Sequence, residues 1–202
     1  VLETGDATEV ESICEAADSI DGPVYCRVLR GNIPRIFNTP IVVGEIRELN
    51  LGNDILIVTA GITTEEAIRA TKALEATGVS VRHLHLNTIK PFDNVAMLDQ
   101  INSVKGGVVT LENHLIEGGI GSLIAEIMAD NGVGKKLKRL GLRDTYAHGG
   151  SRGYLMRYYG LDALALTRGI EEIMNQKLNI TESDLAEARV DAVHSLAKAE
   201  AL

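Results

Sequence analysis

The sequence predicts an α/β fold in which a mainly parallel sheet carries helices on both faces. Short β-branched runs such as DILIVT (54–59) alternate along the chain with segments of helical periodicity, as expected of parallel strands joined by helices. The 202 residues have the composition of an ordinary globular protein, with 45% hydrophobic and 24% charged residues. Because aromatic residues supply only 3%, Val, Ile, Leu and Ala must form most of the core.

The first expected element is an amphipathic helix over about residues 8–20, with Asp6 or Thr8 as its cap. Its apolar residues follow the spacing i, i+3, i+4 and i+7 and are Val10, Ile13, Cys14 and Ala17. This spacing predicts that Cys14 is buried. A turn follows and leads to an expected strand, Val24–Leu29.

Glycines and prolines in residues 31–44 predict an extended linker, after which strands and helices alternate. The expected strands are Glu45–Asn50, Asp54–Thr59, Val79–Leu86, Gly107–Leu111 and Lys136–Leu140. The expected helices cover about residues 64–77, a short stretch after Asp93, 120–131, 151–159 and 162–176. Thr63 and Glu66 have the spacing of a capping box, and Asp93 is the expected N-cap of the short helix.

One more helix is expected near the C-terminus. Thr181 and Asp184 are suited to begin it, and an apolar stripe follows. The stripe consists of Leu185, Ala188, Ala192, Val193 and Leu196. It is expected to pack either on its own domain or on a partner chain, and periodicity does not separate these alternatives.

Charge and hydropathy exclude several classes of function. A net charge of −8 argues against nonspecific nucleic-acid binding, which needs many lysines and arginines to neutralise phosphates. No apolar run approaches the ~20 residues of a membrane span. Cys14 and Cys26 suggest no disulfide framework, so we expect a reducing, cytoplasmic location. Because residue 1 is Val rather than Met, we also expect the chain to be part of a longer one.

A glycine cluster, Gly118-Gly119-Ile120-Gly121-Ser122, separates an expected strand from an expected helix, as in nucleotide-binding turns. The dinucleotide fingerprint needs a third glycine, but Ile124 stands in that position. The P-loop needs a lysine, and residues 112–134 contain neither Lys nor Arg. Glu112 and Glu117 would also oppose an anion. We therefore predict a structural corner, in which glycines permit close approach of the backbone to another surface.

The histidines give weaker signals. His83 and His85 share one face of an expected strand, but no third ligand supports a metal site there. His114 and His148 lie in expected loops, where we predict ordinary hydrogen-bonded histidines, and His194 is expected to be solvated. No Ser/His/Asp set and no carboxylate pair has a spacing that indicates catalysis.

Arg30 gives a better chemical signal. It follows directly on the expected strand Val24–Leu29, and ligands of open α/β sheets bind outside the carboxyl ends of strands. A guanidinium also binds phosphate well, through paired hydrogen bonds. The spacing alone supports a phosphate contact and a surface ion pair equally.

Five segments together resemble the C-terminal part of transketolases, especially the separate C-terminal subunit of enzymes that are split over two chains. The segments are GPVYCRVLRGNIPRIF (22–37), DILIVTAG (54–61), NTIKPFD (87–93), TLENHLIEGGIGS (110–122) and GLRDTYAHGGSRGYLMRYYGL (141–161). The resemblance covers about residues 5–175. Each motif is weak alone, and the specificity lies in their common order.

The resemblance implies an enzyme that uses thiamine diphosphate and a divalent metal such as Mg²⁺ to move a two-carbon ketol unit between sugar phosphates. Residues 1–37 would end a pyrimidine-binding domain, 38–44 would be a linker, and 45–202 would form a third domain with an extra terminal helix. That domain would be a three-layer α/β/α structure with a five-stranded, mostly parallel mixed sheet and one antiparallel edge strand. It would serve subunit contacts and would not touch the cofactor.

The resemblance also assigns roles to two positions. Arg30 matches the family arginine that binds the substrate phosphate, and Asp6 matches an aspartate that hydrogen-bonds a substrate hydroxyl. The family's catalytic glutamate would belong to sequence before residue 1, so no catalytic residue and no cofactor are expected on this chain. The implied partners are a second copy in a homodimer, an N-terminal diphosphate-binding subunit and a sugar phosphate, with neither nucleic acid nor membrane.

Three other interpretations remain open. A 1-deoxyxylulose-5-phosphate synthase has similar RG and HGS-like motifs. The beta subunit of a 2-oxo-acid dehydrogenase has a related third domain, but it usually lacks the phosphate arginine that Arg30-Gly31-Asn32 would provide. A non-enzymatic assembly module would describe the chain taken alone.

Overall fold

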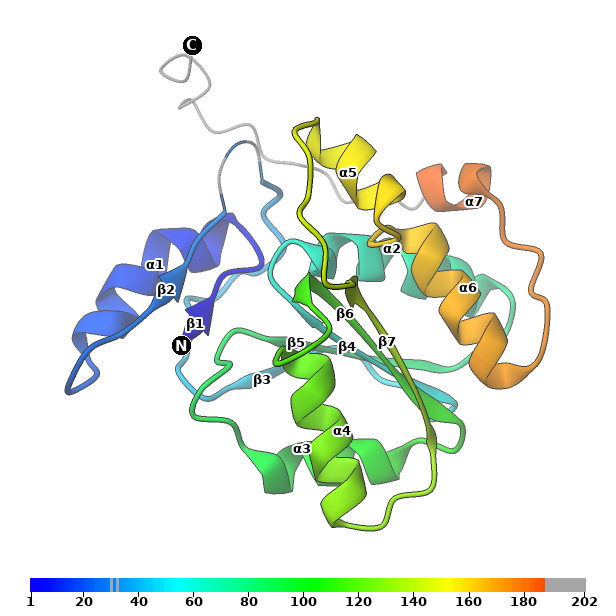
Figure 1. Cartoon of the computed structure of the whole chain (residues 1–202), viewed down its shortest axis with the longest axis horizontal. Coiled ribbons are helices and arrows are strands. Elements are labelled where there is room, and N and C mark those ends of the chain that lie inside the picture. Colours follow the sequence, from blue (N-terminus) through cyan, green and yellow to red (C-terminus); the bar gives the residue numbers. More distant parts are fainter. Residues whose placement is uncertain (30, 32, 188–202) are drawn as a thin grey trace.

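A five-stranded sheet forms the centre of the molecule, with the strand order β3-β5-β4-β6-β7 (Figure 1). The computed structural model describes residues 1–29, 31 and 33–187. The strands of this sheet are β3 (Ile46–Asn50), β4 (Ile55–Ala60), β5 (Val81–Leu86), β6 (Gly107–Leu115) and β7 (Lys136–Leu142). Four of them run parallel, and β3 is the antiparallel edge strand beside β5. The predicted fold class is confirmed.

Helices cover both faces of this sheet and complete a three-layer structure (Figure 1). The layer on one face contains α2 (Thr63–Ala76), α5 (Arg152–Tyr158), α6 (Ala163–Met174) and α7 (Glu182–Glu187). The layer on the other face contains α3 (Asn94–Ser103) and α4 (Ile120–Asp130). Each layer has its own apolar cluster against the sheet, so the core is double-sided.

The central strand β4 shows how the sequence builds both layers. All of its residues are buried, and its side chains alternate between the two apolar clusters. Ile55 and Ile57 belong to one cluster, and Leu56 and Val58 belong to the other. A strand that is covered on both faces needs no solvent-facing residues, which is why the run Ile55–Val58 is continuously apolar.

The order of the strands creates a change of direction beside β4. After β4 the chain passes through α2 to β5 on one side, and it then passes through α3 to β6 on the other side. Such a switch point opens a crevice at the carboxyl ends of parallel strands, where ligands commonly bind. Leu86, Ala60 and Glu112 lie side by side at this edge.

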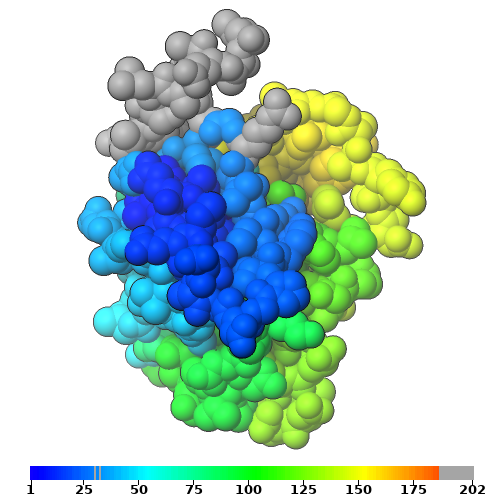
Figure 2. All heavy atoms as spheres, turned by 90° about the vertical axis from the view of Figure 1, so that its left-hand side faces the viewer, coloured from blue at the N-terminus to red at the C-terminus, as the bar shows by residue number. Residues whose placement is uncertain are grey.

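An N-terminal segment, residues 1–43, packs against this carboxyl edge. Its regular elements are β1 (Leu2–Glu3), α1 (Ala7–Asp18) and β2 (Cys26–Arg27), and the two strands pair in parallel. The Glu3 N–H donates to the carbonyl of Asn87, just after β5, at 2.9 Å. Figure 2 shows the segment, in blue, lying against the cyan and green parts of the sheet domain. The segment therefore covers the carboxyl edge of the sheet, where the switch-point crevice would open.

The helix caps follow the sequence in two cases and depart from it in one. Asp6 caps α1 and Asp93 caps α3, as predicted. The predicted capping box of Thr63 and Glu66 is wrong, because α2 begins after Ile62 and has no side-chain cap.

Tertiary partners explain the missing capping box. The Thr63 hydroxyl lies 2.8 Å from the carbonyl of Ala60, the last residue of β4, and 2.7 Å from the carbonyl of Leu111, in the middle of β6. Glu66 accepts the N–H of Ala163 at the start of α6 (2.8 Å). Both side chains thus bind other elements instead of the first turn of their own helix.

Three local predictions also change. Cys14 is exposed rather than buried, because α1 packs through Ile13 and buries Glu9 one turn earlier. The strand predicted at Val24–Leu29 shortens to β2, since only its two residues pair with β1. The strand predicted at Gly107–Leu111 is longer, since the last residue of β6 also pairs with β7.

The C-terminal helix is described in its first part. α7 begins after Thr181, whose N–H donates to the carboxylate of Asp184 (2.7 Å) and supports the predicted start. Leu185 is buried in the apolar cluster with α2 and α6. The rest of the predicted stripe, from Ala188 onward, and His194 lie outside the described residues. Within the described residues, no helix combines the length and apolar character needed to span a membrane.

We predict that Gly52→Ala destabilises the fold. A Cβ at this position would lie 2.3 Å from the backbone carbonyl of Val81 at the start of β5, and backbone cannot yield as a flexible side chain can. The expected loss in the free energy of unfolding is about 1–3 kcal/mol, the range for overpacked sites. Urea unfolding followed by circular dichroism measures it.

Gly134→Ala is the matched control for this change. A Cβ on Gly134 would meet no atom within 4 Å, so the free energy of unfolding should change by less than about 0.5 kcal/mol. Equal losses in the two variants would show that the contact with Val81 is not the cause.

Candidate functional site

The first predicted site residue, Asp6, lies at the start of α1 and is fully buried. Its carboxylate accepts three backbone N–H groups, each at 2.8 Å: Oδ1 accepts from Glu9, and Oδ2 accepts from Ile36 and Phe37. The carboxylate therefore ties the first turn of α1 to the chain that returns from the loop at residues 28–33. Its contact with a substrate hydroxyl stays a prediction.

The second predicted site residue, Arg30, stands between Arg27 and Pro34 in the sequence and lies outside the described residues. Both ends of the loop are held beside the start of α1. On one side, the Thr4 N–H donates to the Arg27 carbonyl (3.1 Å). On the other side, the Ala7 N–H donates to the Pro34 carbonyl (3.0 Å). The base of the loop and the buried aspartate therefore lie together.

A buried glutamate that sequence reasoning did not single out, Glu9, links the N-terminal segment to the sheet. Its Oε2 accepts the Gly5 N–H (2.8 Å) and lies 3.0 Å from Nε2 of His85 on β5. Its Oε1 lies 3.3 Å from Nε of Arg47 on β3, close enough for charge attraction but not aligned as a hydrogen bond. Burial opposes ionisation, but His85, the Gly5 N–H and Arg47 outweigh it and lower the pKa of Glu9.

His85 continues this contact into the core. Its Nδ1 lies 2.7 Å from the Thr64 hydroxyl, which is 3.1 Å from the Thr59 hydroxyl. Thr59 in turn lies 3.0 Å from Nε2 of His83, so the two histidines face the same side of β5, as predicted. Burial, with a smaller effect of His85, lowers the pKa of His83 to about 3, and this ring stays neutral. The described residues group no three His, Cys, Asp or Glu side chains as metal ligands.

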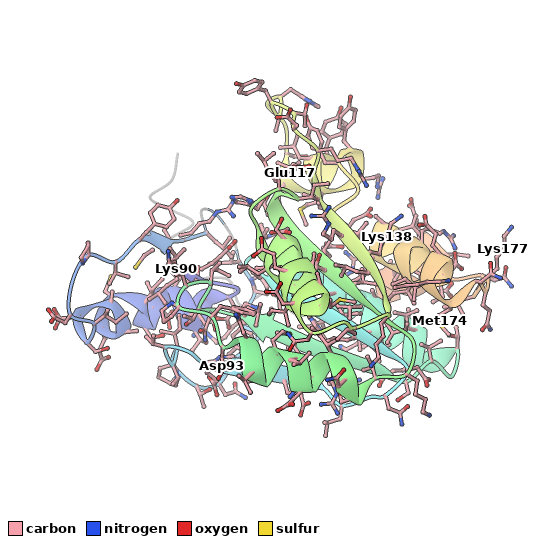
Figure 3. All side chains as sticks on the ribbon, turned by 60° about the horizontal axis from the view of Figure 1, so that its bottom comes forward. Lys90, Asp93, Glu117, Lys138, Met174 and Lys177 are labelled. Atoms are coloured by element: carbon pink, nitrogen blue, oxygen red, sulfur yellow. The ribbon has the colours of Figure 1, made fainter. Side chains whose placement is uncertain are left out.

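A groove of about 800 Å³ lies at the carboxyl edge, between the N-terminal segment, the loop after β5 and the start of α4. Its charged lining residues include Glu3, Arg27, Lys90 and Glu112, and Figure 3 labels Lys90 beside the N-terminal segment. Burial raises the pKa of both carboxyl groups, against opposing contributions from Arg27 at Glu3 and from backbone N–H groups at Glu112. Arg27 lies 3.1 Å from Glu3 and also donates to the Asn113 carbonyl (2.7 Å). Three of these four charges thus have partners within the chain.

The glycine cluster forms the predicted structural corner. Glu112 accepts the N–H groups of Ile120 (2.8 Å) and Gly121 (3.0 Å) at the first turn of α4. A helix N-terminus can hold an anion, but here the chain's own carboxylate fills that position. A Cβ on Gly119 would lie 1.9 Å from Oε2 of Glu112, so only glycine permits this close approach.

His114 and His148 are both exposed and hydrogen-bonded, but only His148 lies in a loop as predicted, because β6 extends through His114. Nδ1 of His114 lies 2.9 Å from the carbonyl of the next residue, and Nδ1 of His148 lies 3.0 Å from the Tyr159 hydroxyl. The rings of Tyr154 and Tyr158 meet His148 edge-on, with centroid distances of 5.6 and 4.9 Å. His148 therefore belongs to an aromatic cluster, and these contacts give it no catalytic partner.

The burial of Glu112 could be predicted from the sequence, whereas the burial of Glu9 could not. Glu112 follows an apolar run, VVTL, where a charged side chain demands a partner, and this mismatch is a usable signal. Glu9 stands three residues after the cap Asp6, where an acidic residue is ordinary. Nothing local marks Glu9 as buried, because its partner His85 is 76 residues away.

The sequence profile of the family described as "Transketolase, C-terminal domain" matches residues 44–166, more than half of the chain. The chain belongs to the transketolase C-terminal domain family. The matched range contains the whole sheet and the glycine corner, but neither Asp6 nor Arg30. Membership in the transketolase family therefore rests on the C-terminal domain itself.

Similar proteins extend the transketolase comparison beyond that domain. The 6-deoxy-6-sulfo-D-fructose transketolase subunit of Clostridium sp. (strain MSTE9) is 34% identical over 179 residues, 88% of this chain and 55% of that protein. The 1-deoxy-D-xylulose-5-phosphate synthase 1 of Geobacter sulfurreducens is 31% identical over 179 residues, 85% of this chain and 28% of that protein.

A solved structure also matches the transketolase-family fold. It is described as a split gene transketolase, inactive beta4 tetramer, and superposes with a TM-score of 0.79 at 30% identity, covering 87% of this chain and 58% of that one. The chain thus spans about half the length of the transketolase subunits it matches.

We predict that Glu112→Ala destabilises the corner. The change removes the acceptor of two N–H groups at the start of α4, which should cost about 1–3 kcal/mol in the free energy of unfolding. Glu117→Ala is the control at the same turn, because Glu117 is exposed (Figure 3) and should matter by less than about 0.5 kcal/mol. Urea unfolding measures both, and equal losses would exclude the buried acceptor as the cause.

The cost of Glu112→Ala should also depend on pH. Because burial raises the pKa of Glu112, the folded state holds this proton more tightly than the unfolded state does. The stabilisation from Glu112 is then complete below the ordinary glutamate pKa of 4.5 and declines as pH rises through the raised value. The difference between wild type and variant should shrink over that range. A difference that grows with pH would contradict the raised pKa.

Proposed function

We propose that this chain is the C-terminal part of a thiamine-diphosphate-dependent transketolase that moves a two-carbon ketol unit between sugar phosphates. The observation that carries the proposal is the transketolase C-terminal domain match, in a chain that spans 55% of a named transketolase subunit. The chain would supply subunit contacts and part of the substrate phosphate site, and the catalytic centre would lie in another part of the enzyme.

The glycine corner does not fit the diphosphate of thiamine diphosphate. The helix N-terminus at the glycine corner, where a diphosphate would find free N–H groups, is filled by Glu112. The described part of the chain also groups no set of metal ligands. We therefore assign the cofactor and its divalent metal to an N-terminal diphosphate-binding subunit, with which this chain would assemble.

Arg30 and Asp6 are the residues proposed to bind the substrate. Arg30 would bind the phosphate through paired hydrogen bonds. Asp6 is buried and accepts three backbone N–H groups, and its remaining acceptor position would take a hydrogen bond from a substrate hydroxyl. The backbone contacts at Arg27 and Pro34, which bring the base of the Arg30 loop beside Asp6, support this pairing. The two relatives are named for a sulfo sugar and a sugar phosphate, both of which carry an anionic group.

We propose that the chain consists of three segments and that the enzyme contains more than one copy of the chain. Residues 1–37 would end a pyrimidine-binding domain, 38–44 would be a linker, and 45–202 would form the C-terminal domain with an added terminal helix. A homodimer contact is supported by the split gene transketolase, which is described as a tetramer of its beta chain. A cytoplasmic location is supported by the two cysteines, which are both free.

A 1-deoxyxylulose-5-phosphate synthase is the second candidate function. The Geobacter sulfurreducens relative is 31% identical to this chain, only slightly less than the transketolase subunit at 34%. The chain covers 28% of that synthase but 55% of the transketolase subunit. The synthase is therefore the alternative to the proposed transketolase.

In the assembled enzyme, we predict that Arg30→Ala raises the KM for phosphorylated acceptors much more than for unphosphorylated ones. A lost hydrogen bond to a charged group is worth about 1.5–3 kcal/mol, or roughly 10- to 150-fold in binding. Steady-state kinetics with a sugar phosphate and its unphosphorylated counterpart measure the ratio. Arg143→Ala, which removes an exposed arginine, is the control. Equal increases for both acceptors would remove the phosphate role.

We also predict that the isolated chain does not bind thiamine diphosphate in the presence of Mg²⁺. Isothermal titration calorimetry should show no binding heat for the 202 residues, and binding should return when the N-terminal subunit is added. Circular dichroism confirms that the isolated chain is folded. Tight binding by this chain alone would contradict the assignment of the cofactor site to another subunit.

A further inference from the structure

We propose that His85 of β5 is a positioning residue for substrate binding, because through Glu9 and Phe37 it fixes the base of the loop that carries Arg30. This inference rests on the proposed function and adds a role for the C-terminal domain within it. A residue of the sheet would set the affinity for the substrate phosphate without touching the substrate.

The first step is the anchoring of residues 34–37, the stretch that follows the Arg30 loop. Oδ2 of Asp6 accepts two backbone N–H groups of this stretch at 2.8 Å. The Thr8 hydroxyl donates to the Phe37 carbonyl (2.6 Å). The chain that leaves the loop is thus bound to the first turn of α1, and a shift of that turn would move it.

The second step is the attachment of that turn to β5. Oε2 of Glu9 lies 3.0 Å from Nε2 of His85 and accepts the Gly5 N–H at 2.8 Å. A Cβ on Gly5 would lie 2.5 Å from Cε1 of His85, so the backbone just before α1 rests directly on the imidazole. All three residues are buried, and water cannot replace a lost contact. His85 therefore sets where α1 begins.

The third step is a direct contact with the anchored stretch. The centroid of the Phe37 ring lies 5.0 Å from the centroid of the His85 ring. The same Phe37 centroid lies 4.7 Å from Cζ of Arg47. Arg47 also donates to the carbonyls of Thr39 (3.2 Å) and Pro40. The stretch after the loop is thus held by two residues of the sheet as well as by α1.

His83 provides a matched control two residues earlier on β5. Both imidazoles are fully buried on the same face of the strand. Nε2 of His83 lies 3.0 Å from the Thr59 hydroxyl, within the core of the sheet domain. Removal of His83 therefore disturbs the same core, but not the contact with Glu9.

The experiment compares His85→Asn, His85→Gln and His83→Asn in the assembled enzyme. An Asn amide reaches only the Nδ1 position and loses Glu9, whereas Gln places a donor near the Nε2 position. We expect His85→Asn to raise the KM for a sugar phosphate about 10-fold more than for its unphosphorylated counterpart, since small misplacements of binding groups are costly. His85→Gln should restore much of the ratio, and His83→Asn should leave it within about twofold of wild type.

Phe37→Leu tests the same idea if His85→Asn fails to assemble. It removes the ring contact with His85 and keeps an apolar side chain of similar reach. It should raise the KM ratio in the same direction. Proportional changes for both acceptors, in whichever of these two variants assembles, would overturn the positioning role. An equal change of the ratio in His83→Asn would overturn it as well.

Arg30→Ala separates this inference from the function on which it rests. If Arg30→Ala is not selective for the phosphorylated acceptor, the phosphate assignment fails. If Arg30→Ala is selective and His85→Asn is not, the phosphate assignment stands and the positioning role alone fails.

Discussion

The buried charge of Glu9 is the constraint on which the union of the N-terminal segment and the sheet depends. A carboxylate that is removed from water needs charges and hydrogen bonds in place of the solvent. Glu9 takes these from its own segment, at Gly5, and from two strands of the sheet, at His85 and Arg47. Loss of one partner of a buried ion pair typically costs about 3–5 kcal/mol, because the other charge stays buried and uncompensated. The segment and the sheet are therefore expected to move as one body.

The same union brings most of the charged groups at the switch-point crevice together with partners within the chain. In open α/β sheets this crevice is the usual place for ligands. Here Glu3 stands over the end of β4, where a Cβ on Gly61 would lie 2.2 Å from its Oε1. Arg27 pairs with Glu3, and Glu112 fills the N-terminus of α4. Most of the charged groups that line the groove at this edge are thus paired within the chain, which agrees with a phosphate site elsewhere.

Local patterns determined the order of elements, and contacts between distant residues determined the rest. The apolar run of β4 and the regular stripe of α4 each specify an element from a few consecutive residues, so the fold class could be predicted. The buried face of α1 could not, because it is decided by Glu9 and not by the apolar spacing that included Cys14. Thr63 failed as a cap because its hydroxyl lies 2.7 Å from a carbonyl 48 residues away. Of the site, the sequence marked Asp6 as a cap and predicted the glycine corner, but it did not show that Glu112 fills that corner.

A stretch that looks like a linker in the sequence can be firmly attached to its neighbours in the structure, as residues 38–44 are. Domain boundaries usually fall where few contacts cross them. This stretch is instead bound to the sheet, since Arg47 donates to two of its carbonyls and the Gly44 N–H donates to the Thr88 hydroxyl (2.8 Å). Close-packed interiors transmit a displacement rather than absorb it. A change on β5 therefore reaches the first turn of α1 through a single buried side chain, Glu9.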